Sequence, residues 1–161
     1  FYTKMSWKGF SLFANFSFSH GNQVYNATRH YNELGNGFSN QAASMGRRWV
    51  AEGQVTDIPR VVYGDPAGNN RFSSRWIEDG SYLKLKELRV EYLLPRSLCA
   101  KTKVFQNVSL SFFVTNVFCI TNFPQFDPEV ASLSGSSLYR GVETGAYPMT
   151  RSYGFSLKLG F

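Results

Sequence analysis

The sequence predicts an all-β chain whose antiparallel strands form part of a transmembrane β-barrel. The clearest evidence is the segment 150–161, where apolar and small or polar residues alternate. The apolar set is Tyr153, Phe155, Leu157, Leu159 and Phe161. A period of two puts these side chains on one face of a strand and Ser152, Gly154, Ser156, Lys158 and Gly160 on the other. In a barrel one such face meets lipid and the other meets the lumen.

Composition supports the same fold class. Aromatic residues make up 17% of the 161 residues, although the mean hydropathy is negative, at −0.25. This combination is typical of a barrel wall joined by polar loops. The sequence has no run of 18 apolar residues, so we expect no transmembrane helix.

Five segments carry strand patterns. They are residues 1–6, 10–19, 81–94, 108–120 and 150–161. A tight turn at 6–9 joins the first two, and only Phe13 breaks the alternation of the second. In the third strand the apolar parity changes after Leu85 and resumes at Leu88. A β-bulge near Lys86 and Glu87 would shift the phase in this way. Pro95 ends that strand.

The connections alternate in length. Those at 6–9 and 95–107 are shorter, whereas those at about 20–80 and 121–149 are long and rich in Asn, Gly and Ser. Alternate connections of an antiparallel sheet lie on the same side, so we expect periplasmic short turns and extracellular long loops. Two aromatic belts are expected to mark the bilayer interfaces. The short-turn belt is Trp7, Phe10, Tyr92, Phe105 and Phe161, and the other is Phe18, Trp76, Tyr82, Phe118, Phe123 and Tyr153.

Charge and cysteine usage exclude several classes of function. The net charge is +6, but residues 19–80 are neutral and the remaining basic residues are scattered along the sequence. A nucleic-acid surface would need them clustered, so we expect no nucleic-acid partner. Cys99 precedes the predicted strand 108–120 and Cys119 lies at its far end, which is too far apart for a disulfide. With His20 and His30 as the only histidines and no C-x-x-C motif, no zinc site is expected.

A soluble β-sandwich is the alternative fold, and a soluble β-rich carbohydrate-binding or adhesive module is the alternative function. Alternating strands occur there too, but a loop of about 60 residues is unusual in a compact sandwich. The apolar face of 153–161 discriminates between them. It should face lipid in a barrel and pack against a second sheet in a sandwich.

The stretch from Arg75 to Pro95, RWIEDGSYLKLKELRVEYLLP, resembles the carboxy-terminal region of SusC/RagA-type TonB-dependent transporters of Bacteroidota. Further segments agree with that family in order and spacing: VYNATR at 24–29, TDIPR at 56–60, VTNVF at 114–118, FDPEV at 126–130 and GAYP at 145–148. The resemblance implies a 22-stranded outer-membrane barrel with an amino-terminal plug, of which this chain would be the last five strands.

The resemblance also implies function and partners. Such transporters import oligosaccharides or peptides through the bacterial outer membrane, with energy passed on by TonB-ExbB-ExbD and with a SusD-like lipoprotein as lid. Because the chain begins at Phe1 without an initiator Met, we expect a piece of a longer protein that lacks the plug. Its other partners would be the remainder of the transporter, the lipid bilayer and the barrel-assembly machinery. No cofactor is implied.

No catalytic or metal site is expected, and the chain is predicted not to be an enzyme. Glu78-Asp79 and Asp127-x-Glu129 are paired carboxylates, but Asp79 before Gly80 and Asp127 before Pro128 are typical of turns. Nucleotide-binding and zinc-protease motifs are absent.

Aromatic and basic residues of the long loops are the candidate contacts to the lid or to substrate, and the alternative is that the rings pack the loops into ordered caps. Trp, Tyr and Arg are favoured anchors of protein interfaces, and sugars stack on aromatic rings. The candidates are Trp49, Tyr63, Trp76, Tyr139, Tyr147, Arg47, Arg48 and Arg140, with Arg60 on the same argument. By resemblance, the closing strand also carries an assembly signal. Its residues are Ser152, Gly154, Leu157, Leu159 and Phe161.

Overall fold

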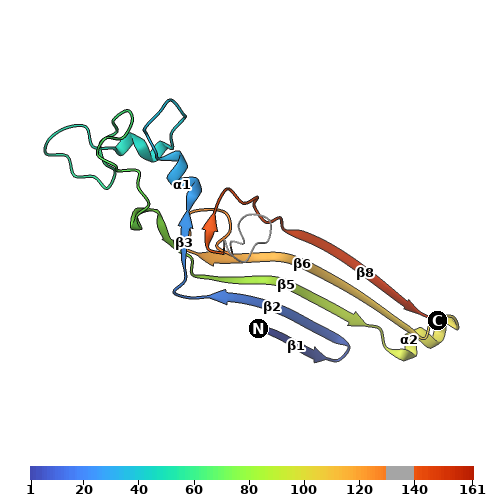
Figure 1. The fold of residues 1–161 in the computed structure, drawn as a ribbon. Coiled ribbons are helices and arrows are strands. Elements are labelled where there is room, and N and C mark those ends of the chain that lie inside the picture. The colour runs from blue at the N-terminus through green and yellow to red at the C-terminus, as the bar shows by residue number, and fades with distance from the viewer. Residues whose placement is uncertain (130–139) are drawn as a thin grey trace. The chain divides into compact units, whose positions relative to one another are not determined.

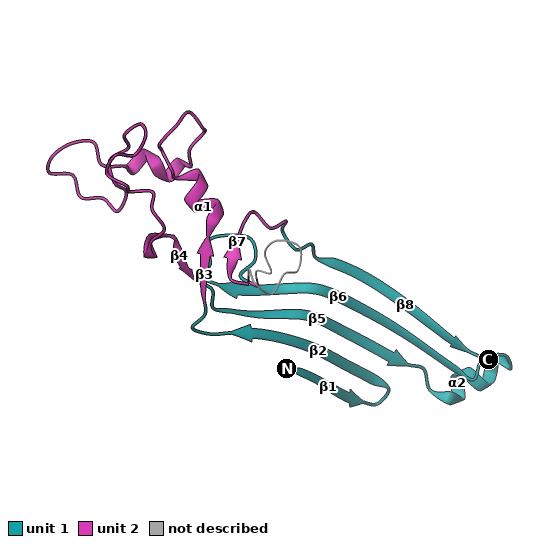
Figure 2. Cartoon of the chain, viewed as in Figure 1, with its two compact units in different colours: residues 1–22, 80–128, 148–161 teal, residues 23–79, 129–147 magenta. Residues whose placement is uncertain are grey.

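The computed structural model of the chain describes residues 1–129 and 140–161. These residues form two compact units (Figure 2). The first, here the sheet unit, comprises residues 1–22, 80–128 and 148–161. The second, here the loop unit, comprises residues 23–79 and 129–147.

The sheet unit is built on five antiparallel strands (Figure 1). They are β1 (Tyr2–Trp7), β2 (Phe10–Ser19), β5 (Tyr82–Leu93), β6 (Asn107–Thr121) and β8 (Ser152–Gly160). Their order across the sheet is β1-β2-β5-β6-β8, so each strand pairs with the next strand of this set along the chain. The all-β fold class expected from the sequence is confirmed.

Cross-strand pairing joins the apolar residues of all five strands into one surface, here called the apolar face. One row reads Trp7, Phe10, Tyr92, Leu110 and Leu157. The next reads Met5, Leu12, Val90, Phe112 and Phe155, and the middle row reads Thr3, Ala14, Leu88, Val114 and Tyr153. Two shorter rows follow, Phe16–Leu85–Phe118 and Phe18–Leu83–Ile120.

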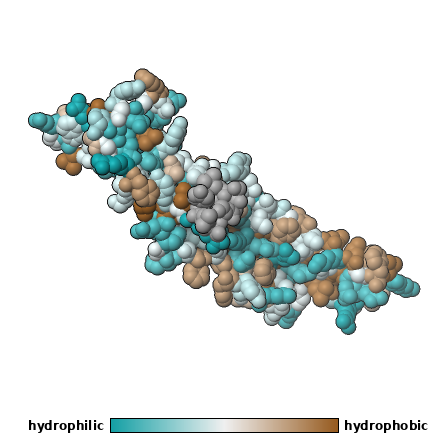
Figure 3. Space-filling view, viewed as in Figure 1, coloured by the Kyte–Doolittle hydropathy of each residue, from teal (hydrophilic) through white to brown (hydrophobic). Residues whose placement is uncertain are grey.

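Much of the apolar face is exposed. Phe155 is 77% exposed, Leu157 60% and Ile120 64%. Apolar side chains accordingly reach the molecular surface along the sheet unit (Figure 3). The opposite, polar face carries rows such as Ser6, Ser11, Glu91, Ser111 and Ser156. A sheet with one exposed apolar face and one polar face is what a barrel wall requires.

The register shifts where the sequence predicts a bulge. Asn15 pairs with Glu87 and Phe16 with Leu85, so β5 carries one extra residue, Lys86, between these two pairs. On the other side the ladder steps from Leu85–Phe118 to Glu87–Thr115, so β6 carries the extra residue there. Asn116, in that step, has a positive φ of 52°, a conformation that Asn tolerates better than most residues. The bulge keeps the apolar residues of β5 on one face despite their change of parity.

The placement of Phe13 differs from simple alternation. Phe13 lies on the polar face, in the row that pairs Lys4, Arg89, Phe113 and Gly154. Phe13 therefore breaks the alternation because its ring lies on the polar face, and the pairing of β2 is regular at this residue.

Tyr153 was expected at the level of the long connections, and this is wrong. β8 begins at Ser152, and Tyr153 pairs with Val114 in the middle row of the apolar face. The starting point of β8 sets this depth, and alternation alone does not specify it.

Both shorter connections are ordered. The β1–β2 turn places Lys8 at φ 44° and Gly9 at φ 88°, the left-handed pair that suits a two-residue hairpin. A side chain at Gly9 would put Cβ 2.9 Å from the carbonyl oxygen of Leu93. The connection between β5 and β6 contains a helix that the sequence analysis did not anticipate, α2 (Arg96–Thr102). It follows Pro95, and Lys103 ends it in the left-handed conformation.

The loop unit has secondary structure of its own, although its segments were expected only as long loops. A three-stranded sheet has the order β4-β3-β7, in which β3 pairs antiparallel with β4 and parallel with β7. The strands are β3 (Gln23–Asn26), β4 (Ile77–Asp79) and β7 (Val142–Glu143), and the helices are α1 (Ala27–Asn32), η1 (Ala43–Arg47) and η2 (Ser74–Trp76).

Candidate functional site

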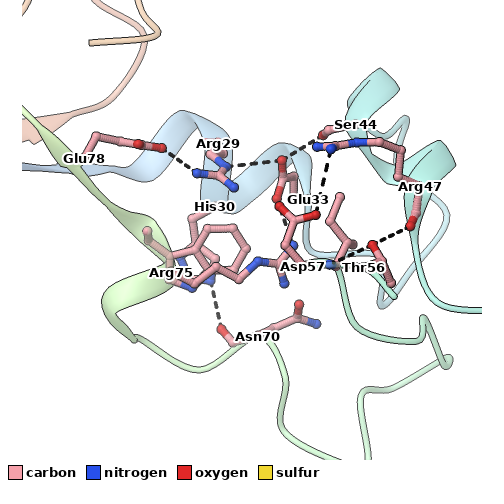
Figure 4. Close-up of polar contacts among 12 residues, drawn as sticks. Arg29, His30, Glu33, Ser44, Arg47, Thr56, Asp57, Asn70, Arg75 and Glu78 are labelled. Atoms are coloured by element: carbon pink, nitrogen blue, oxygen red, sulfur yellow. Dashed lines mark hydrogen bonds and ion pairs between the residues drawn. The ribbon is translucent and has the colours of Figure 1, made fainter. Parts of the chain in front are cut away.

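The loop unit is organised around the buried carboxylate of Glu33, just after α1. The side chain is 3% exposed and pairs with Arg29 at 3.3 Å and with Arg75 at 2.8 Å. The hydroxyl of Ser44 donates to it at 2.7 Å (Figure 4). Arg29 in turn pairs with Glu78. The cluster thus joins α1, η1 and the adjacent elements η2 and β4, which come from three separate parts of the sequence. It holds together the framework from which the loop residues project.

Electrostatics favour the charged form of both central groups. Burial by itself would raise the pKa of Glu33, but the hydrogen bond from Ser44 and the charges of Arg29 and Arg75 outweigh it and lower that pKa. Burial likewise opposes the charge on Arg29. The hydrogen bond to Glu78 and the nearby Glu33 reverse this effect, and the pKa of Arg29 is raised. Both Glu33 and Arg29 are therefore charged at neutral pH.

Trp76 belongs to the core of the loop unit. It is fully buried, its ring stacks on His30 at 4.5 Å between centroids, and its Nε1 donates to the carbonyl oxygen of Arg71 at 3.1 Å. His30 is held by Tyr25, whose hydroxyl contacts Nδ1, and by the carbonyl oxygen of Asn70 at 2.8 Å from Nε2. The prediction that Trp76 is a surface contact is therefore wrong. Its ring is buried against His30, and its Nε1–H group is bonded to a backbone carbonyl oxygen.

Four of the candidate residues lie in one loop: Arg47, Arg48, Trp49 and Arg60. The backbone of Trp49 donates to Ile58 at 2.9 Å, and Thr56 donates to the carbonyl oxygen of Arg47 at 2.7 Å. These bonds close the segment 47–58 on itself. Arg47 and Arg48 are exposed, whereas Trp49 is half-buried with the Arg60 guanidinium 6.0 Å from its ring.

The other candidates are exposed or lie outside the described residues. Tyr63 is 73% exposed and rests on Phe38 at 5.6 Å between ring centroids. Tyr147 is 83% exposed, and Arg140 is also exposed. Tyr139 lies outside the described residues. The loop unit thus presents aromatic and cationic side chains suited to contact another molecule.

The polar face of the sheet unit contains a site that the sequence analysis missed. Six residues from β1, β2 and β5 line a hollow of about 280 Å³: Lys4, Ser11, Phe13, Glu87, Arg89 and Glu91. Arg89 pairs with Glu87 at 2.8 Å, and its guanidinium lies 5.5 Å from the Phe113 ring. The sequence pattern that could have indicated this site is the spacing of Glu87, Arg89 and Glu91. Every second residue of a strand lies on the same face, so these three charges share one side of β5.

The proposed assembly residues occupy β8 and its end. Leu157 and Leu159 lie on the exposed apolar face, and Ser152 lies on the polar face opposite Thr115. Phe161 is 76% exposed and packs on Phe105 with centroids 5.4 Å apart.

Gly154 has a packing role that its place in a motif does not reveal. It pairs with Phe113, and a Cβ there would lie 2.3 Å from the ring. The absence of a side chain makes room for this ring on the polar face.

Within residues 1–129 and 140–161, no cluster of three or more His, Cys, Asp or Glu side chains could hold a metal ion. None of the helices described there is long and apolar enough to cross a membrane.

Comparison with known proteins identifies relatives over the whole chain. TonB-dependent receptor P3 of Formosa agariphila is 32% identical over 165 residues, which cover all of this chain and 16% of the relative. TonB-dependent receptor P26 of the same organism is 27% identical, with the same coverage. No family model matches the chain.

A solved structure agrees with these relatives. The RagAB peptide importer in the "closed-closed" state superposes with a TM-score of 0.77 at 28% identity. The match covers 97% of this chain and 16% of that one, so the chain spans about one sixth of the length of its relatives. These relatives are named as receptors and as an importer. The identity, the full coverage and the amphipathic five-stranded sheet together establish that the chain belongs to the TonB-dependent receptor family and is part of its transmembrane β-barrel.

Proposed function

We propose that the chain is the carboxy-terminal part of the barrel wall of a TonB-dependent importer of oligosaccharides or peptides in the bacterial outer membrane. The observation that carries the proposal is the apolar face, which runs without interruption across β1, β2, β5, β6 and β8 and is exposed. Lipid is the environment in which such a face is stable. The chain itself would catalyse no reaction.

The alternative, a soluble carbohydrate-binding or adhesive module, requires a second layer over the apolar face. Tyr153, Phe155 and Phe161 are 64%, 77% and 76% exposed, so the discriminating segment has no covering sheet within the described residues. Five strands with one bare apolar face would aggregate in water. The barrel function is therefore preferred.

We further propose that the loop unit faces the cell exterior and meets a SusD-like lipoprotein. Tyr63, Tyr147 and the Arg47–Arg48 pair are exposed on a unit whose core the Glu33 cluster holds together. Aromatic and arginine side chains on a firm scaffold are typical anchors of a protein interface. The structure of RagAB, a peptide importer, supports peptides as one substrate class, and SusC-type transporters support oligosaccharides as the other.

The transport function can be tested in cells that carry the full-length transporter. Uptake of labelled oligosaccharides and labelled peptides would be measured in wild-type cells, in a strain lacking the transporter and in a strain lacking TonB. We expect one of the two substrate classes to enter only when both transporter and TonB are present. Uptake of both classes that is independent of the transporter would refute the proposal.

The lid contact needs a separate test. Tyr147→Ala and the double variant Arg47→Glu/Arg48→Glu should weaken co-purification of the lipoprotein with the full-length transporter. Glu52→Gln is the matched control, because Glu52 is exposed in the same loop. Unchanged co-purification in both test variants would refute the contact.

A further inference from the structure

Four basic residues that are dispersed in the sequence gather at one end of the sheet unit. Lys8 lies in the β1–β2 turn, and Arg96, Lys101 and Lys103 lie in or directly after α2, which joins β5 to β6. Because β2 and β5 are neighbours, these two connections lie at the same end of the sheet (Figure 1). We call these four residues the basic end. They are scattered along the sequence, and only the antiparallel pairing of β2 with β5 brings them together.

The two connections that carry the basic end contain no acidic residue. Residues 1–9 and 92–107 contain no Asp or Glu. All four side chains are exposed, and within the described residues none of them forms an ion pair. A group of cations with this exposure is available for an external anionic partner.

An apolar, aromatic row lies directly beside the basic end. Trp7, 71% exposed, and Phe10, 50% exposed, flank the turn that carries Lys8, and they begin the outermost row of the apolar face. The Lys8 ammonium lies 4.9 Å from the centre of the Trp7 ring, on a side chain of that face. The other lysines near this end, Lys4 and Lys158, are on the polar face instead.

We propose that the basic end binds the anionic headgroups of phospholipids in the membrane leaflet next to the short connections. The inference rests on the proposed function, because it requires the apolar face to lie in a bilayer. Cations directly outside an aromatic row are positioned at headgroup level, where anionic lipids attract them. An acidic protein would explain the charges but not their position beside an exposed apolar row, so lipid is the better partner.

The test uses the full-length transporter, purified in a non-ionic detergent. Native mass spectrometry would compare its binding of phosphatidylglycerol, which is anionic, with that of phosphatidylcholine, which has no net charge. The test variant is Lys101→Gln/Lys103→Gln. A second variant, Lys101→Arg/Lys103→Arg, keeps both charges, and Arg71→Gln removes an exposed charge from the loop unit. Heat-modifiable electrophoretic mobility would establish that each variant is folded before lipid is added.

We expect the wild type to prefer phosphatidylglycerol, and the glutamine pair to lose about tenfold or more in affinity for it. Each basic residue near an anionic surface contributes about fivefold. The arginine variant and the loop-unit variant should keep the wild-type affinity. Raising the salt concentration should remove the difference between wild type and the glutamine pair, because the attraction is screened.

Three results would overturn the proposal: equal binding of the two lipids by the wild type, an equal loss in the loop-unit variant, or an equal loss in the arginine variant. Normal lipid binding by the glutamine pair together with loss of a co-purified protein would also overturn it, in favour of a protein partner. Failure of TonB-dependent uptake in cells would refute the proposed function instead. It would leave the lipid measurement intact, so the two failures are distinguishable.

Discussion

Arginine substitutions at Tyr153, Phe155 and Leu157 measure how deeply each residue of β8 lies in lipid. The three residues share the apolar face and are 64%, 77% and 60% exposed, so a longer side chain meets no packed neighbour across a second layer. They occupy the middle row and the next two rows toward the short connections, inside the Val108–Leu159 pair. One strand therefore samples three depths in the same surface.

The expected costs follow from the rows. Five rows two residues apart span about 26 Å along the strands, at about 3.3 Å per residue. A tilt of about 40° reduces this to a height of about 20 Å, close to the apolar band of an outer-membrane barrel. Arginine should therefore cost roughly 2–4 kcal/mol at Tyr153, near the midplane, and about 0–1 kcal/mol at Leu157, in the aromatic row. Phe155 should be intermediate.

The assay is the folded fraction of the full-length transporter in bilayers across a urea series, read from heat-modifiable mobility. Each arginine variant is compared with alanine at the same position, which removes the effect of losing the apolar side chain. Ser152→Arg and Ser156→Arg are controls on the polar face of the same strand. They should be tolerated better than Tyr153→Arg and Phe155→Arg.

A flat profile along β8 would refute the depth assignment. Equal losses for Ser156→Arg and Phe155→Arg would refute the assignment of the faces themselves. If Leu157→Arg were costlier than Tyr153→Arg, the midplane would lie nearer the short connections than the rows indicate.

Three further predictions concern the loop unit, the closing residue and the polar face. Glu33→Gln should destabilise the loop unit by roughly 2–3 kcal/mol, because it leaves Arg75 and Arg29 with a neutral partner in a partly buried site. Faster hydrogen exchange across 27–35 would measure this. Because the pKa of Glu33 is lowered, its stabilisation is complete above its ordinary value of 4.5 and is lost as the pH falls through the lowered value. Protection of the same peptide should therefore fall only in acid. Phe161→Ala should reduce the amount of transporter in the outer membrane while uptake per assembled molecule stays near wild type. Gly154→Ala should reduce folding yield, at a cost of about 1–3 kcal/mol, because the new Cβ clashes with the Phe113 ring.

Each of these predictions has a matched control. Glu52→Gln removes an exposed carboxylate of the loop unit and should leave exchange across 27–35 unchanged; an equal effect would contradict the role of the Glu33 cluster. Normal abundance with impaired uptake in Phe161→Ala would contradict an assembly role. In a Phe113→Ala background, Gly154→Ala should cost much less, and an undiminished cost would mean that the ring is not the cause.

Local alternation was enough to predict the strands and the faces of the sheet unit. The pattern at 10–19 corresponds to β2, at Phe10–Ser19, and the parity change at Lys86 and Glu87 corresponds to the observed bulge. These features follow from the two-residue repeat of a strand, which is a property of neighbouring residues and needs no knowledge of the rest of the fold.

Tertiary structure decided what no local pattern encodes. Trp76 is buried because His30 and Arg71 meet it. The charged form of Glu33 is favoured in the core by Ser44, Arg29 and Arg75, the last of which is 42 residues away. Lys8 and Lys101 form one basic end because the pairing of β2 with β5 places their connections at the same edge. Alternation reports which face a side chain occupies, whereas burial, ion pairing and clustering depend on residues that only the folded chain brings together.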